Sequence, residues 1–370
     1  MGIGDKIREI EDEMRRTQYH KGTEHHFGML KAKLAKLKKE LIKPSGKGKG
    51  GGFDIRRSGD ASVVIIGFPS VGKSTLLNAL TSAESKVAAY EFTTLGVVPG
   101  VMLHKGARIQ ILDLPGILEG ASRGRGRGKE VLSVARSADL ILILLDVFGG
   151  DKLDVIKREL HEMGIRINAR PPRVVITPMK KDGVNVSSTV KMTKLDERMI
   201  QEVLGVYGIY NADVVVREDV DVDGFIDVVV GNRRYAPALV VVAKIDLVDE
   251  KARETIRREL AAKGEGAVLV SAEKKIGIKE LRDKIYEKLD LMRIFTRPWK
   301  GEADLDEPMI IRRGADVEEV CNKLHRGLKE EFKHALIWGK SVKFGGQKVG
   351  LKHVLQDGDV VMIIKRRGGE

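Results

Sequence analysis

The side chains with the clearest potential for chemistry lie in one short run, Gly67-Phe68-Pro69-Ser70-Val71-Gly72-Lys73-Ser74. Two glycines, a lysine and a hydroxyl residue at this spacing match the phosphate-loop pattern, in which backbone N–H groups at a helix N-terminus bind the β-phosphate of a nucleotide. Lys73 would contact the β- and γ-phosphate oxygens, and the Ser74 hydroxyl would bind Mg²⁺. The sequence therefore predicts a nucleotide site formed by Gly67, Pro69, Ser70, Val71, Gly72, Lys73, Ser74 and Thr75.

Two later segments contain residues that could sense a γ-phosphate. Asp113, in Asp113-Leu114-Pro115-Gly116, could hold the Mg²⁺ through water, and the Gly116 N–H could bond the γ-phosphate. In Phe92-Thr93-Thr94, a threonine hydroxyl could complete the magnesium shell only when a triphosphate is bound; we favour Thr94, and Thr93 stays an open alternative. The predicted catalytic residues are Lys73, Thr94 and Gly116, and the predicted metal ligands are Ser74, Thr94 and Asp113.

A third pair of segments predicts the choice of base. In Ala243-Lys244-Ile245-Asp246, the Asp246 carboxylate can accept hydrogen bonds from guanine N1 and N2, for which adenine has no matching donors. In Ser271-Ala272, the backbone of Ala272 can donate to guanine O6. We therefore add Lys244, Asp246, Ser271 and Ala272 to the predicted site, and this order of motifs is that of a GTPase.

The scaffold that must position these residues is visible as short apolar runs. SVVIIG, IQILDLPG, LILILLDV, ALVVVAKID and AVLVSA are separated by segments long enough for helices, which indicates an α/β fold with a mostly parallel sheet covered on both faces. The distance from Asp113 to Asp246 is about twice what two helices and a strand need at roughly 30 residues per βαβ unit. We therefore predict an inserted α+β subdomain, with strands at VVIT, NVSS and DVVVR and a helix over 196–206.

The two ends of the chain have their own patterns. Apolar residues at helical spacing over 3–18 and 24–43 predict a helical hairpin, and residues 44–52 read as a flexible linker. One face of the second helix has five lysines, which are either solvated or aligned along a phosphate backbone: Lys31, Lys33, Lys36, Lys38 and Lys39. After Met292, strands at 309–311, ALIW, VKF and DVVMII and a helix over 316–331 predict a small mixed sheet with one helix.

These patterns together predict five parts. They are a helical hairpin (1–45), a Gly-rich linker (46–60), a nucleotide-binding domain (61–167 and 236–292), the inserted subdomain (168–235) and a C-terminal domain (293–370).

Composition narrows the functional classes. The chain has 370 residues with a formal net charge of +13, which favours polyanionic partners such as RNA. The longest apolar run, Leu140–Leu145, is far shorter than the roughly 18 residues of a membrane span, and we read no signal peptide. Cys321 is the single cysteine, which fits a reducing compartment. We expect a cytoplasmic, monomeric protein without a membrane partner.

The motifs GFPSVGKST, YEFTTLGVVPG and DLPGILEGASRGRGRG, together with the insertion, resemble the developmentally regulated GTP-binding (DRG) family of the Obg superfamily. The tail, with DVEEVCNKL and LQDGDVVMII, resembles a TGS domain, a ubiquitin-like β-grasp module. The resemblance covers nearly the whole chain. It implies a GTPase with GTP or GDP and Mg²⁺ as ligands, association with ribosomes or RNA, a role in translation and a family-specific regulatory protein.

Two positions depart from the usual GTPase pattern. Ala243 replaces an Asn whose side chain normally braces the guanine-binding loop against the phosphate loop. Ile117 stands where many GTPases have a water-orienting Gln, so we expect slow intrinsic hydrolysis, on the order of 10⁻⁴ to 10⁻² s⁻¹. Relatives with that substitution often recruit K⁺ through an Asn where this chain has Ser70, so K⁺ dependence stays open.

Weaker signals leave alternatives. The stretch 219–224 imitates an EF-hand start, but Val230 replaces the final Glu, so we read an acidic turn. The segment 123–129, rich in Arg and Gly, could contact RNA phosphates or an acidic partner, could place an arginine on the bound nucleotide, or could be a solvated loop. Two other functions compete with the GTPase switch: a non-catalytic RNA- or ribosome-binding scaffold with a degenerate nucleotide site, and a P-loop ATPase or kinase.

Overall fold

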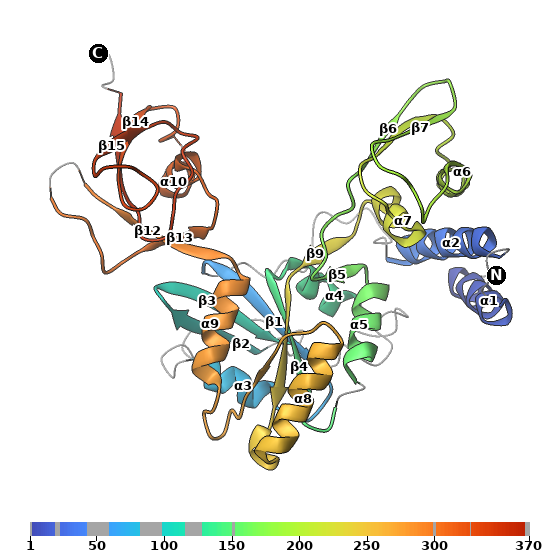
Figure 1. The fold of residues 1–370 in the computed structure, drawn as a ribbon, viewed down its shortest axis with the longest axis horizontal. Helices are drawn as coiled ribbons and strands as arrows, with labels where there is room; N and C mark the ends of the chain where they lie inside the picture. The colour runs from blue at the N-terminus through green and yellow to red at the C-terminus, as the bar shows by residue number, and fades with distance from the viewer. Residues whose placement is uncertain are drawn as a thin grey trace. The chain divides into compact units, whose positions relative to one another are not determined.

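The computed structural model describes residues 2–18, 23–42, 59–81, 98–114, 128–149, 152–298, 301–325 and 327–366. The chain forms two compact units, drawn in Figure 1. The first unit contains residues 1–53, 120–136 and 157–236, and the second contains residues 54–119, 137–156 and 237–370.

A six-stranded sheet is the centre of the second unit. Its strand order is β11-β10-β4-β1-β3-β2, and every neighbouring pair is parallel except β2 and β3, which are antiparallel. The strands are β1 (Ala61–Gly67), β2 (Val98–His104), β3 (Ala107–Asp113), β4 (Leu140–Asp146), β10 (Ala238–Ala243) and β11 (Ala267–Leu269). The five predicted apolar runs therefore form the parallel strands, as the fold class predicted, and β2 adds an unpredicted antiparallel edge.

Burial explains why these runs form strands. All seven residues of β1 are buried, so both of its faces lie under other elements, which is typical of a parallel sheet. Helices α3 (Lys73–Leu80) and α9 (Ile278–Lys288) contact each other and the sheet, and α8 (Glu250–Ala262) packs near β11. A short 3₁₀ turn, η3 (Ile245–Leu247), follows β10. The resulting core places the ends of β1, β3 and β10 where the predicted site residues begin.

The tail forms a second sheet in the order β13-β12-β16-β14-β15. Its elements are β12 (Leu291–Thr296), β13 (Met309–Arg312), α10 (Val317–Leu324), β14 (Phe332–Trp338), β15 (Gln347–Val349) and β16 (Val360–Lys365). One helix on a small mixed sheet is what the sequence predicted.

Two predicted elements of the tail are wrong in detail. The helix expected to reach Glu331 ends at Leu324, because His325 is extended at φ −163°. The run VKF is a turn, since the Lys343 N–H bonds the Gln347 side chain at 2.9 Å and the chain pairs with β14 only from Gln347 onward.

The first unit combines a helical hairpin with a three-stranded sheet. The hairpin is α1 (Ile3–Arg16) and α2 (Glu24–Ile42), and α2 packs on α6 (Glu197–Val206) and α7 (Val222–Val230). The sheet has the order β6-β8-β7, with β6 (Val174–Pro178), β7 (Val184–Ser188) and β8 (Ala212–Val216). These are the predicted hairpin and inserted α+β elements.

Helix α7 was not predicted. The acidic stretch read as a turn supplies its N-cap, because the Asp221 carboxylate accepts a hydrogen bond from the Gly224 N–H at 2.8 Å. A parallel pair, β5 (Ile165–Ile167) and β9 (Arg234–Ala236), follows in the same unit. Helices α4 (Gly128–Ser137) and α5 (Lys152–Glu162) complete the described elements, and none of the described helices is both long and apolar enough to cross a membrane.

Candidate functional site

The phosphate loop lies between the end of β1 and the first residue of α3. Ser70 and Gly72 both have left-handed backbone conformations, with φ of 63° and 99°, and Gly72 provides the glycine that this geometry favours. Gly67 is required for another reason: a Cβ there would lie 2.5 Å from the Leu144 carbonyl oxygen of β4. The two glycines of the motif thus allow the loop to turn tightly against the sheet before α3 begins.

Lys73 is held inside this loop by backbone oxygens. Its ammonium donates to the carbonyls of Gly67 at 3.1 Å and Phe68 at 3.0 Å. Burial lowers the pKa of Lys73, and the negative charge of Asp113 opposes that shift. A partly desolvated cation whose hydrogen bonds go to neutral carbonyls is suited to an anionic ligand, because a phosphate would supply stronger, charge-assisted bonds.

Ser74 and Asp113 meet beside Lys73. The Ser74 hydroxyl donates to Asp113 Oδ2 at 2.8 Å, joining the first turn of α3 to the end of β3. Asp113 is only 7% exposed, and its Oδ1 is buried with no hydrogen-bond partner among the described residues. Hydroxyl and carboxylate oxygens are the donors that Mg²⁺ prefers, and an unsatisfied buried oxygen gains a partner when a cation binds. These two residues therefore fit a magnesium site.

The predicted base-binding residues also come together. Lys244 adopts a left-handed conformation after β10 and donates to the Ser70 carbonyl of the phosphate loop at 2.7 Å. The side-chain hydrogen bond with Ser271 lowers the pKa of Asp246, so this carboxylate is ionised at neutral pH. Ser271 is fully buried and also accepts the Lys274 N–H at 3.2 Å. Ala272 follows it in the same turn.

The contact from Lys244 to the phosphate loop is one that sequence reasoning missed. Ala243 stands where an Asn usually braces these two loops. Ala243 is indeed buried and has no polar side-chain atom, but Lys244 makes a direct bond to Ser70 instead. The sequence signal that could have indicated this contact is that Lys244, with its long cationic side chain, directly follows Ala243.

Some predicted residues cannot be compared with the structure. Thr93, Thr94, Gly116, Ile117 and the stretch 123–127 lie outside the described residues. Gly128 and Lys129 open α4.

Four of the five lysines of α2 fit neither reading that the sequence left open, because they bond to other parts of the first unit. Lys36 donates to the Val206 carbonyl at 2.8 Å and Lys39 to the Val230 carbonyl at 2.7 Å, which are the last residues of α6 and α7. Lys31 donates to Asp223 at 2.6 Å.

Two lysines complete this set. Lys38 lies 3.4 Å from Glu11 and 3.6 Å from Glu162, whereas Lys33 is exposed. Four of the five lysines therefore bind other parts of the first unit, and they do not form a free stripe for a phosphate backbone.

A family profile described as "50S ribosome-binding GTPase" matches residues 62–178, one described as "C-terminal region of MMR_HSR1 domain" matches 181–291, and one described as "TGS domain" matches 292–365.

Similar proteins match the chain over almost its full length. "Uncharacterized GTP-binding protein MJ1326" of Methanocaldococcus jannaschii is 52% identical, over 99% of this chain and 94% of that protein. "GTP-binding protein 1" of Schizosaccharomyces pombe is 49% identical, over 99% of this chain and 100% of that protein. "Developmentally-regulated GTP-binding protein 2" of Homo sapiens is 46% identical with the same coverage.

Proposed function

The chain belongs to the developmentally regulated GTP-binding protein family and is a GTP-binding GTPase, and from this premise we propose that it is a Mg²⁺-dependent switch acting on ribosomes or RNA. The observation that carries the proposal is the phosphate loop, where the half-buried Lys73 ammonium is bonded to two carbonyls beside the Ser74–Asp113 pair. Residues 61–167 and 236–292 form the GTPase domain in this proposal. The protein acts as a cytoplasmic monomer.

Ser74 and Asp113 are the magnesium-binding residues in this proposal, and Thr94, or the alternative Thr93, joins them when GTP is bound. Mg²⁺ bound there would neutralise charge on the β- and γ-phosphates. Lys73 binds the same phosphates, and the Gly116 N–H reports the γ-phosphate. Ser74→Ala should weaken the dependence of nucleotide affinity on Mg²⁺ concentration, measured by titration of a fluorescent GTP analogue at several Mg²⁺ levels.

Guanine selectivity is assigned to Asp246, with Ala272 as a backbone donor. The hydrogen bond between Asp246 and the buried Ser271 fixes the Asp246 carboxylate. A fixed polar group rejects a base that lacks matching donors. We expect ATP to compete for the site about 100-fold or more weakly than GDP, and Asp246→Ala to remove most of that difference. Equal competition by ATP and GDP in the wild-type protein would favour the P-loop ATPase or kinase alternative.

The rate of hydrolysis distinguishes a switch from a scaffold. Ile117 cannot orient water, so we propose slow intrinsic hydrolysis, on the order of 10⁻⁴ to 10⁻² s⁻¹. Single-turnover measurements with GTP should show phosphate release that rises when ribosomes are added. Bound GTP with no release under either condition would favour the non-catalytic scaffold. Parallel reactions in K⁺ and Na⁺ would decide the K⁺ alternative, since Ser70 replaces the usual Asn.

The partner assignment rests on charge and on family membership. A surplus of 13 positive charges favours polyanions, and the family resemblance adds ribosomes and a regulatory protein. Sedimentation with ribosomes in GTP, GDP and a non-hydrolysable analogue tests the switch. More protein should sediment with the triphosphates than with GDP, and equal sedimentation in all three would contradict the proposal.

A further inference from the structure

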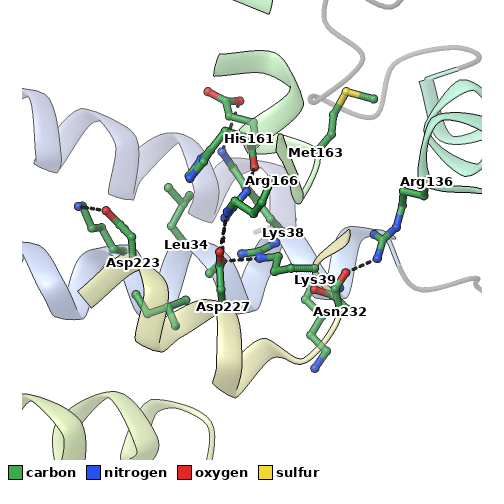
Figure 2. A pocket seen from close by; sticks show the side chains of 15 residues that line it. Leu34, Lys38, Lys39, Arg136, His161, Met163, Arg166, Asp223, Asp227 and Asn232 are labelled. Carbon is green, nitrogen blue, oxygen red and sulfur yellow. Dashed lines mark hydrogen bonds and ion pairs between the residues drawn. The ribbon is translucent and has the colours of Figure 1, made fainter. Parts of the chain in front are cut away.

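A cavity of about 120 Å³ lies in the first unit, away from the phosphate-loop residues in sequence. It is surrounded by side chains of α2, the last turn of α4, the end of α5 with Met163, strand β5, and α7 with the residues that follow it. Figure 2 shows Lys38, Lys39, Arg136, His161 and Arg166 around it. A volume several times the roughly 30 Å³ share of one water molecule can hold a group of several heavy atoms.

The lining of this cavity has more positive than negative charge. Six cations face three carboxylates, those of Glu162, Asp223 and Asp227, which leaves an excess of three positive charges. The cations are Lys31, Lys38, Lys39, Arg136, Arg166 and Arg233.

Each of the three carboxylates already pairs with one or more cations of the protein. Asp227 is 6% exposed and accepts from Arg166 Nε at 2.5 Å, from Arg166 Nη2 at 2.7 Å and from Arg233 Nε at 2.7 Å. One buried carboxylate therefore serves two guanidinium groups. Asp223 binds Lys31, and Glu162 lies 3.6 Å from Lys38.

Two cations have hydrogen bonds only to neutral oxygens among the described residues. Arg136 donates to the Asn232 carbonyl, and Lys39 donates to the Val230 carbonyl at 2.7 Å. Burial, followed by the charges of Arg233 and Arg234, lowers the pKa of Arg136, which reports a cation crowded by other cations. Burial and Arg166 also lower the pKa of His161, so this ring is neutral at pH 7.

We propose that this cavity binds the phosphate group of a small phosphorylated molecule, with Arg136 and Lys39 as its main ligands. A phosphate dianion would offset two of the three excess positive charges, and its oxygens fit the planar donors of a guanidinium group. The cations converge from four chain segments on one cavity instead of following an extended surface (Figure 2), which favours a terminal phosphate over an RNA backbone. The site is independent of the phosphate loop.

Pyrophosphate is the probe, because it carries the proposed group without a base. It is titrated calorimetrically into full-length protein saturated with GDP and Mg²⁺, so that the phosphate loop is already occupied. We expect one site, weakened at least tenfold by Arg136→Gln and by Lys39→Gln. Lys33→Gln, an exposed lysine of the same helix that does not line the cavity, should bind like the wild type.

Hydrogen exchange provides a second readout that does not depend on a variant. In the wild-type protein, pyrophosphate should slow amide exchange in α2 and α7, which both line the cavity. Circular dichroism shows whether each variant is folded. The proposal is overturned if pyrophosphate does not bind, if Arg136→Gln and Lys39→Gln bind it as well as Lys33→Gln does, or if only an RNA oligonucleotide or an acidic peptide protects these helices.

Discussion

The phosphate loop and helix α2 use lysine in opposite ways. Lys73 lies at the start of α3 and donates only to loop carbonyls among the described residues, so its charge remains available to a ligand. Lys36 and Lys39 of α2 donate to the last carbonyls of α6 and α7, where the negative end of each helix dipole attracts a cation. Lysine therefore awaits a ligand in the phosphate loop, whereas in α2 Lys36 binds a helix end and Lys39 does so while also lining the proposed phosphate cavity.

The chain separations explain why sequence found one role and not the other. Lys73 contacts residues five and six positions away, so a local motif specifies its surroundings. Lys36 and Lys39 contact residues 170 and 191 positions away. No pattern within α2 could reveal those partners, and charge runs on helices are ordinarily solvated.

The largest expected effect is on nucleotide binding. Lys73→Ala removes a cation that would make charge-assisted hydrogen bonds to phosphate, so GTP affinity should fall about 100-fold, or roughly 2.7 kcal/mol. Equilibrium binding of a fluorescent GTP analogue measures this fall. Lys279→Ala, at an exposed lysine of α9, is the matched control and should bind as the wild type does. Equal affinity in Lys73→Ala and the control would remove Lys73 from the site.

A smaller effect is expected on stability when the α2 lysines are changed. Lys39→Met leaves the Val230 carbonyl without its charged donor, and Lys36→Met does the same for Val206; each should cost about 1–2 kcal/mol of unfolding free energy. Urea unfolding, monitored by hydrogen exchange in α6 and α7, measures the loss of unfolding free energy.

The control position for that experiment is Lys33, which is an exposed lysine of the same helix α2. Lys33→Met should change the unfolding free energy by no more than about 0.5 kcal/mol. If Lys33→Met destabilises the protein as much as Lys39→Met, the carbonyl contacts have no special importance.

Lys244 combines both uses of lysine, since it bonds the Ser70 carbonyl while lying in the base-binding segment. Lys244→Met should weaken GTP and GDP binding by the same factor, about tenfold, because the phosphate loop loses a brace worth about 1–1.5 kcal/mol. Discrimination between GDP and ATP should be unchanged, since Asp246 is retained. Competition binding with both nucleotides tests this, and a selective loss of GTP alone would refute the bracing role.

The smallest effect is a pH dependence at the start of α2. His25 lies 3.0 Å from Asp196 and 3.5 Å from Glu202, and the bond with Asp196 raises its pKa. Because the folded pKa is the higher one, the charged ring stabilises the fold fully below its unfolded pKa of about 6.5 and loses that effect as pH rises through the folded pKa.

The test is the unfolding free energy of wild type and His25→Gln from about pH 6 to about pH 9. The wild-type advantage should be largest at the acidic end and should shrink as the pH increases. An advantage that is constant over this range would show that ionisation of His25 contributes nothing.

Sequence reasoning succeeded where function depends on local geometry or on a repeated strand pattern. The apolar runs predicted the five parallel strands. Asp113 is the last residue of β3, Asp246 lies in the turn after β10, and Ser74 in the first turn of α3 bonds Asp113. Sequence reasoning did not predict helix α7, because Asp221 acts as an N-cap only in the context of the turn that precedes it. The excess of charge around Arg136 was also invisible, since its neighbours come from four separate segments.

The most direct test of these two roles of lysine is thermal unfolding of Lys73→Ala and Lys39→Met. For each variant, the unfolding midpoint is measured without nucleotide and again with GTP and Mg²⁺. We predict that Lys73→Ala keeps the wild-type midpoint without nucleotide and gains no increase, whereas Lys39→Met starts lower and gains the full wild-type increase. A Lys39→Met protein that gains no increase, or a Lys73→Ala protein that gains the full one, would contradict the account.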